Sequence, residues 1–338
     1  MVIGTAVLAL ALAGGCGSSN KSASHSVQVA DAPTPKGPPL LAAFDSGVGA
    51  VAKGAPAPLW LEKNAVAAVD GSTVFSVRRD GPNAADRLVR LDPKTGAVMF
   101  SWPLSTHGFS VDAVSPKARW IALTDRQPGY GSQDRTSTTI VVFDASEGKE
   151  LHRLMLSGDV QPEAFSTDGS LLFVLNYLGD HYRVQTIMLE TADRYDTSDR
   201  DKTVPSEDMH GHAIHGVTSK NRTLLATLYR NPANSAEPAF VHVLDLQHGW
   251  SYCADLPAPF GTGAPGTDVI ELTDTDTVVV ATEANRLAEI HINDVHTPVT
   301  APGGAPVRVA YRDGTIAQPD SAFRSVPGFE YLITEPAA

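Results

Sequence analysis

The stretch that decides the fold is DAVSPKARWIAL at residues 112–123, because it recurs twice further along the chain. The copies are EAFSTDGSLLFV at residues 163–174 and HGVTSKNRTLLA at residues 215–226. Each copy has the pattern of a short strand, a polar turn and a second apolar strand. Asp168-Gly169 in the second copy is a strong hairpin signal, since glycine accepts the positive φ that a tight turn needs. The sequence therefore predicts a series of β-hairpins.

Further strands follow these hairpins. A third apolar run ends in an acidic turn in LVRLD at residues 88–92, IVVFD at 140–144 and VHVLD at 241–245, and VMFSW at 98–102 has the pattern of a fourth strand. Four short strands per unit, repeated about every 50 residues, are typical of a β-propeller blade. Helical periodicity is nearly absent. We therefore predict an all-β protein whose residues 59–338 form a β-propeller of six or seven four-stranded blades, closed into a ring because open sheet edges invite aggregation.

Family resemblances agree with this architecture. Residues 211–246 resemble a degenerate WD repeat, with Gly211-His212, VTSK at 217–220 and FVHVLDL at 240–246. STDG at 166–169 is similar to the Ser-Pro-Asp-Gly turn of bacterial propeller repeats, and LVRLDPKTG at 88–96 resembles a quinoprotein-type blade. No Trp-Asp pair occurs and no Ser-Pro-Asp-Gly turn is complete. The resemblance implies a propeller and no particular activity, since one scaffold hosts many functions.

The N-terminal segment predicts export and lipid attachment. Residues 2–12 are apolar or small, and AGGCGSS follows at 13–19. This run is shorter than the roughly 20 residues of a membrane span and has the length of a signal-peptide core. The order resembles the lipobox of bacterial lipoproteins, which implies a signal peptide over residues 1–15 and a diacylglyceryl lipid on Cys16. The first five residues contain no Lys or Arg. The alternatives are an ordinary secretory signal with a chance cysteine and a buried N-terminal strand.

A flexible tether is predicted to follow. Residues 16–58 begin with polar and small residues, and six prolines between residues 33 and 58 disfavour regular structure. The apolar LLAAF at 40–44 has the alternative of docking onto the domain. The net charge of −12 argues against nucleic acid as a partner. The only other cysteine, Cys253, would have no disulfide partner and is expected to be a small buried apolar residue.

A repeated position in the hairpins yields candidate site residues. Three residues before the Ser or Thr of each turn, ionisable side chains occur in four copies, whereas two copies have Ala65 and Ile270. We expect the four to lie on innermost strands and to converge near the central channel or its mouth. The alternative is that they only solvate a wet channel or join blades by hydrogen bonds. The four candidates are Asp112, Glu163, His215 and Arg308.

The densest histidine cluster, residues 210–215, is a weaker candidate. His210 and His212 would share one face of a strand and could hold a metal with Asp208 or Glu207 nearby. The WD-like resemblance instead implies that His212 is structural and hydrogen-bonds within its blade. We therefore expect no metal and no cofactor.

Two hypotheses for function follow. The first is a monomeric, non-enzymatic scaffold, held on the extracytoplasmic side of the cell membrane by the lipid on Cys16, that binds a protein, peptide or glycan on its loop-lined face. The second is a propeller enzyme, a hydrolase, lactonase or lyase, with its site at the channel mouth. The sequence contains no complete catalytic signature, which favours the scaffold.

Overall fold

A computed structural model describes residues 36–44, 46–79, 81, 84–105, 107–125, 135–179, 181–199, 208–219, 221–230, 239–260, 269–272, 277–282, 286–292, 307–313, 326–327 and 329–333. Regular structure within these ranges is entirely β-strand. Accordingly, the described residues include no helix that could cross a membrane. The strands form six sheets, named here A to F in chain order.

The strands of the first three sheets have the following bounds. Sheet A contains β1 (Lys36–Phe44), β2 (Gly47–Lys53), β3 (Trp60–Lys63) and β26 (Phe329–Leu332). Sheet B contains β4 (Val66–Ala67), β5 (Val74–Arg79), β6 (Asp86–Leu91) and β7 (Val98–Pro103). Sheet C contains β8 (Phe109–Val114), β9 (Trp120–Asp125), β10 (Ser137–Asp144) and β11 (Lys149–Ser157).

The other three sheets complete the set. Sheet D contains β12 (Asp159–Phe165), β13 (Leu171–Tyr177), β14 (His181–Met188), β15 (Arg194–Asp196) and β17 (Met209–His210). Sheet E contains β16 (Ser198–Asp199), β18 (His212–Thr218), β19 (Leu224–Arg230), β20 (Ala239–Asp245) and β21 (Trp250–Leu256). Sheet F contains β22 (Val269–Leu272), β23 (Thr277–Ala281), β24 (Arg286–Ile292) and β25 (Val307–Asp313).

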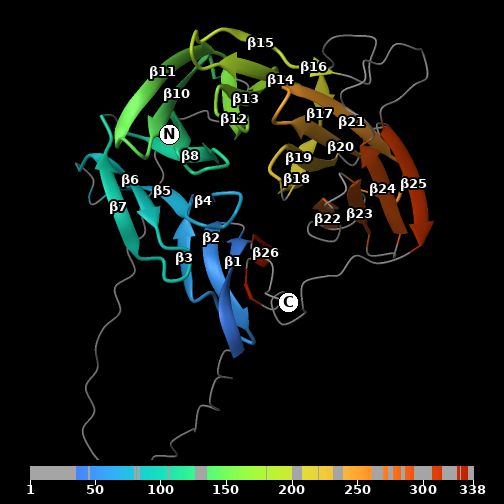
Figure 1. Ribbon diagram of the computed structural model, residues 1–338, viewed down its shortest axis with the longest axis horizontal. Coiled ribbons are helices and arrows are strands. Elements are labelled where there is room, and N and C mark those ends of the chain that lie inside the picture. The colour runs from blue at the N-terminus through green and yellow to red at the C-terminus, as the bar shows by residue number, and fades with distance from the viewer. Residues whose placement is uncertain are drawn as a thin grey trace, which may run out of the picture.

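The sheets stand around a central axis, with β4, β8, β12, β18, β22 and β26 nearest the centre (Figure 1). Pairing is antiparallel except for β16, which runs parallel to β21 at the outer edge of sheet E. Sheet A combines strands from the beginning and the end of the described chain, because β26 pairs with β1. This arrangement confirms the predicted all-β propeller; sheets A, B, C and F have four strands as predicted, and sheets D and E have five.

The hydrophobic core lies between neighbouring sheets. Phe75 and Leu88 of sheet B share one buried cluster with Ile121 and Phe143 of sheet C. Other clusters join sheets A and B, C and D, D and E, and E and F. Each of sheets A to E therefore buries apolar residues against the sheet that follows it in the chain.

Glycine turns fit tightly against indole rings of the preceding sheet. Gly148, in the turn between β10 and β11, has φ +68°, and a Cβ there would lie 2.7 Å from Trp102 Nε1. The Gly148 N–H donates to the Asp144 carbonyl at 2.8 Å, which closes the turn. Only glycine meets both the backbone and the packing requirement here.

The predicted tether boundary at residue 58 is wrong. β1 and β2 pair with each other and belong to sheet A, and Leu40, Ala42 and Phe44 are buried beside Val326. The alternative, that LLAAF at 40–44 docks onto the domain, is therefore correct, because these residues pair with β2 and β26. Prolines 38 and 39 are tolerated because they lie where the β1–β2 register is irregular, between residues 36 and 40. Cys16 lies outside the described residues.

Candidate functional site

Hydrogen bonds in the hairpin turns establish which positions are equivalent in the inner strands. The N–H of a turn serine donates across the hairpin in sheets C, D and E, from Ser115 to the Trp120 carbonyl, from Ser166 to the Leu171 carbonyl and from Ser219 to the Leu224 carbonyl, at 2.8, 3.0 and 3.0 Å. The sequence alignment, which used Thr218 as the turn residue, is therefore off by one in sheet E. Gly216 is the equivalent of Asp112 and Glu163, and His215 lies one residue earlier.

Asp112 and Glu163 remain equivalent, and both lie at β-bulges. The register of β8 against β9 shifts between Val111 and Ala113, and that of β12 against β13 shifts between Pro162 and Ala164. A bulge inserts one unpaired residue and changes the direction of its side chain. Since β8 and β12 are in contact, the two bulged acids occupy adjacent inner strands of the ring.

Arg308 does not join this set. It lies on β25, the outermost strand of sheet F, where it is paired with His291. The prediction of an inner-strand position was wrong because its turn signal, Asp313-Gly314, begins at the last residue of an outer strand.

The two histidines of the weaker candidate also separate. His210 belongs to β17 and pairs with His181 in sheet D, whereas His212 begins β18 in sheet E. The shared face predicted for them is therefore wrong, because Gly211, with φ +98°, divides the strands. The carboxylate of Asp208 is bound by the guanidinium of Arg183. Among the described residues, no group of three or more His, Cys, Asp or Glu is placed to hold a metal ion.

Glu163 has the most unusual environment of the predicted residues. Its Oε2 is buried and accepts no hydrogen bond from the described residues. Burial raises the pKa of this carboxyl from 4.5 to about 7. The side chain is therefore close to half-protonated at neutral pH, the condition for exchanging a proton in either direction.

Three tyrosines from sheets D and E lie within electrostatic range of this acid, because its charge raises the pKa of each. The ring centroids of Tyr177 and Tyr182 are 5.7 Å apart, and those of Tyr182 and Tyr229 are 5.5 Å apart. Burial, followed by the charge of Glu163, raises the pKa of Tyr177 to about 12, and the same two causes raise the pKa of Tyr229. The phenols therefore stay protonated and remain available as hydrogen-bond donors. We call Glu163 and these three tyrosines the acid–tyrosine cluster.

Two further acids contribute to the field at this cluster. The charges of Asp159 and Asp112 also raise the pKa of Tyr177. The Tyr177 hydroxyl donates to Gln161 Oε1 at 3.2 Å. The structure thus brings Asp112 and Glu163 into electrostatic reach of one tyrosine. His215 is buried, which lowers its pKa to about 4 and keeps its imidazole neutral.

A buried ion network braces the strand that carries Glu163. The guanidinium of Arg135 contacts Asp125 at the end of β9 and lies 3.8 Å from Asp159 at the start of β12. Arg135 Nε also donates to Thr138 Oγ1 at 3.1 Å. Removing one charge from such a buried network leaves the others uncompensated. The network therefore joins sheets C and D beside the acid–tyrosine cluster.

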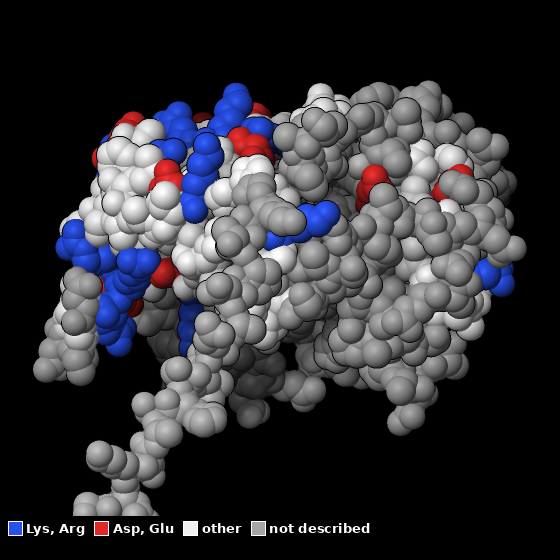
Figure 2. All heavy atoms as spheres, turned by 90° about the horizontal axis from the view of Figure 1, so that it is seen from below, with Lys and Arg blue, Asp and Glu red and all other residues white. Residues whose placement is uncertain are grey.

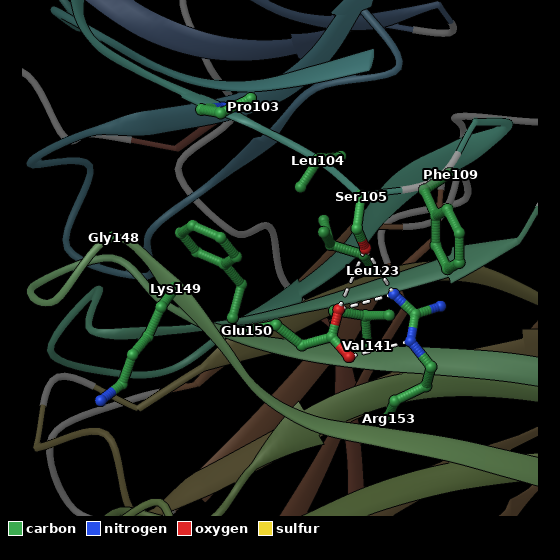
Figure 3. Close-up of a pocket in the computed structure, with 11 residues that line it drawn as sticks. Pro103, Leu104, Ser105, Phe109, Leu123, Val141, Gly148, Lys149, Glu150 and Arg153 are labelled. Carbon is green, nitrogen blue, oxygen red and sulfur yellow. Dashed lines mark hydrogen bonds and ion pairs between the residues drawn. The ribbon is translucent and has the colours of Figure 1, made fainter. Parts of the chain in front are cut away.

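A separate pocket of about 150 Å³ lies between sheets B and C (Figure 3). Its apolar wall includes Phe109, Leu123 and Phe143. At its rim, Arg153 donates to both carboxylate oxygens of Glu150 at 2.8 and 2.6 Å. Because these charges satisfy each other, the pocket offers mainly apolar surface.

The sequence alone did not reveal the tyrosines of the cluster. Tyr177 ends β13 and Tyr229 is next to last in β19, so both lie toward the same end of the second strand of neighbouring sheets. An aromatic residue at that strand end in two successive repeats was the available signal.

Comparisons with known proteins give a fold-level likeness. No protein-family model and no curated protein matches the chain. It is similar to TolB from Acinetobacter baumannii, with 15% identity and a TM-score of 0.42 over 75% of this chain and 59% of that one. The Cps50 (Swd1) β-propeller domain from Myceliophteria thermophila has 11% identity and a TM-score of 0.42 over 73% of this chain and 70% of that one. Kuenenia stuttgartiensis hydrazine synthase has 14% identity and a TM-score of 0.35 over 67% of this chain and 75% of that one. Likeness at this level carries no information about activity or partners.

Proposed function

We propose that this protein is a binding scaffold, held on the extracytoplasmic side of the cell membrane by a lipid on Cys16, whose propeller presents a surface to a protein or peptide partner. The observation that carries the proposal is the position of the exposed large apolar side chains. Of ten among the described residues, seven lie on the outermost strands β3, β7, β11 and β15, which we call the outer rim. They are Leu61, Val98, Met99, Phe100, Leu151, Met155 and Tyr195.

Such a distribution is unusual for a surface without a partner. Single exposed apolar residues are normal, whereas contiguous apolar surface marks interaction sites, and Val98, Met99 and Phe100 are exposed in succession on β7. Met155 is 81% exposed and Phe100 is 51% exposed. The outer rim therefore supports binding by surface contact.

The anchor has a direct test in cells. Cys16→Ser removes the thiol that the lipid would occupy, and the full-length variant is expected to move from the membrane fraction to the soluble fraction. A variant that stays in the membrane fraction would show that another segment holds the protein there.

Binding at the outer rim is tested by site-specific photocrosslinking in cells. A photoreactive side chain at Leu61, Leu151 or Tyr195 is expected to yield discrete adducts of higher mass. The same side chain at Lys117, an exposed position in an inner hairpin turn, is the control. If rim positions give no more adducts than Lys117, the scaffold proposal is wrong.

A second candidate function, a propeller hydrolase, lactonase or lyase, is favoured by one observation. Glu163 has a pKa of about 7 and lies in reach of protonated tyrosines, which suits general acid–base chemistry. Hydrolysis of ester or lactone probes that follows a pKa near 7 and disappears in Glu163→Gln would establish the enzyme. Activity that persists in Glu163→Gln would exclude this site.

A further inference from the structure

One strand of the outer rim differs from the others in sequence. The outermost strands β3, β11, β15, β16 and β25 each contain at least one charged residue, whereas β7, Val-Met-Phe-Ser-Trp-Pro, contains none. Charged residues on edge strands prevent other chains from pairing there. Among the outermost strands described, only β7 and the two-residue β17 lack a charged residue, and β7 is by far the longer of the two.

The exposed edge of β7 is apolar along three consecutive residues. Val98, Met99 and Phe100 are 46%, 49% and 51% exposed. Phe100 stacks on Trp102, with 5.8 Å between ring centroids and 10° between planes, which gives this edge a rigid aromatic surface. Successive side chains point to opposite faces of a strand, so apolar surface is present on both sides of the edge.

The edge also has an unused backbone donor and acceptor. The Leu104 N–H donates to the Asp86 carbonyl at 2.8 Å, and Trp102 and Phe100 lie opposite Leu88 and Arg90 in the same register. Hydrogen bonding alternates along an antiparallel pair, so the N–H and C=O groups of Ser101 face away from β6, whereas Met99 lies at the bulge where the register between β6 and β7 shifts. In the described part of the chain, β7 pairs only with β6.

Cations flank this edge on both faces. Arg90 lies over the Phe100 ring, 5.7 Å from its centroid, and Arg87 Nε donates to Ser101 Oγ at 2.7 Å. Neither guanidinium forms an ion pair with a described carboxylate, and Lys94 is exposed in the turn that leads into β7. An added strand would lie about 4.8 Å beyond β7, on the side toward which both arginines reach.

This part of the chain also differs in charge from the rest. Residues 36–158 contain 14 Lys and Arg and 12 Asp and Glu, whereas the remaining residues contain 12 and 26. On the left of Figure 2, the side on which Figure 1 places β7, Lys and Arg side chains are more prominent than Asp and Glu. Sheets A to C therefore carry a small excess of positive charge within an acidic protein, and Arg87, Arg90 and Lys94 place part of it beside β7.

We propose that β7 is a docking edge for an extended acidic peptide segment of a partner protein, which adds to sheet B as a further strand. Backbone hydrogen bonds to Ser101 would supply the pairing, and acidic side chains would approach Arg87 on one face and Arg90 on the other. This inference rests on the proposed scaffold function and names the surface and the chemistry of its partner.

Two other occupants fit the edge less well. A second copy of the chain pairing through β7 would bring two sets of Arg87, Arg90 and Lys94 together, and like charges across strands destabilise pairing. A lipid surface would leave the outward N–H and C=O groups of β7 without hydrogen-bond partners. An acidic peptide satisfies both the charges and the backbone.

The test uses the full-length protein in detergent and fluorescein-labelled ten-residue peptides in which valine alternates with glutamate or with lysine. Fluorescence anisotropy should detect binding of the glutamate peptide, weaker at high salt, and weaker or absent binding of the lysine peptide. Met99→Lys should weaken the glutamate peptide at least about tenfold. Met155→Lys on β11 is the matched control and should bind like the wild type, since it adds the same charge to a different rim strand.

A charge-swap variant tests the role of the cations without changing any residue of β7. R87E/K94E should lose the glutamate peptide and gain the lysine peptide. Equal binding by Met99→Lys and wild type, no binding by the wild type, or equal binding of both peptides would overturn the proposal. The proposal would also be overturned if the wild type formed a dimer that Met99→Lys abolishes, or if it floated with anionic phosphatidylglycerol vesicles and Met99→Lys did not. These failures concern β7 alone, whereas absence of rim crosslinks would refute the scaffold.

Discussion

Replacing Glu163 with glutamine should stabilise the protein above neutral pH and have little effect in acid. Burial raises the pKa of this carboxyl from 4.5 to about 7, so the folded state holds its proton over a range in which the unfolded state has released it. Stability therefore falls as the pH rises from about 4.5 to about 7 and is constant above that range. At about 1.4 kcal/mol for each unit of pKa, ionised Glu163 costs on the order of 3 kcal/mol at pH 8. Glutamine keeps the shape and has no charge to bury.

The assay is urea unfolding of wild type and variant at pH 5 and pH 8, followed by intrinsic fluorescence. We expect the free energy of unfolding of Glu163→Gln to exceed that of the wild type by about 2–3 kcal/mol at pH 8, with a much smaller difference at pH 5. Glu190→Gln, at an exposed position, is the control and should show no such dependence on pH. A variant that is equally destabilised at both pH values would refute the reasoning, because the carboxyl would then be stabilised in its ionised form.

Three further predictions concern contacts between sheets and strand pairing in sheet A. Gly148→Ala should lower the free energy of unfolding by about 2–4 kcal/mol, because it combines backbone strain with a clash against Trp102. The control Gly54→Ala, at φ +78° with open space around it, should cost only the backbone strain of about 1–2 kcal/mol. Equal losses of the two variants in chemical denaturation would exclude the clash. Arg135→Met should cost about 3–5 kcal/mol by leaving buried carboxylates unpaired, and a change below 1 kcal/mol would show that solvent screens the network. Deleting residues 326–338 removes β26 and should expose the edge of β1, producing aggregates on size-exclusion chromatography; a monomer with unchanged thermal stability would contradict the role of β26 in sheet A.

Much of the fold was predictable because strand and turn signals are local. The Asp-Gly and Ser-containing turns at 115–120 and 166–171 form hairpins as the sequence predicted. The tether boundary was not predictable by composition, since β1 gains its stability from pairing with β2 and β26, and one of these partners lies almost 300 residues away. Prolines near a strand lower its local propensity without preventing pairing at an irregular register.

The site was predictable only in part, because it depends on register. Asp112 and Glu163 were identified correctly as equivalent positions, whereas a one-residue error displaced His215, and a repeat signal at Asp313 placed Arg308 on the wrong strand. A one-residue slip moves a side chain to the other face of a strand, so near-correct alignment gives an incorrect site. The tyrosines join Glu163 through contacts between sheets, which no single repeat encodes.

The edge of β7 could not be predicted from the sequence for a different reason. Its significance comes from comparing the outermost strands with one another, and this comparison requires knowing which strand of each sheet is outermost. The charged residues of β11, such as Lys149 and Glu150, are ordinary in isolation. The absence of charge from the described β7 acquires meaning only beside them.

Hydrogen exchange of the full-length protein, with and without the glutamate peptide, tests the central claim most directly. The account predicts that the peptide slows exchange at the outward-facing amide of Ser101 and leaves the amides of β11 unchanged. Protection that appears instead on β12 around Glu163, with none on β7, would contradict the account and place the ligand in the central channel.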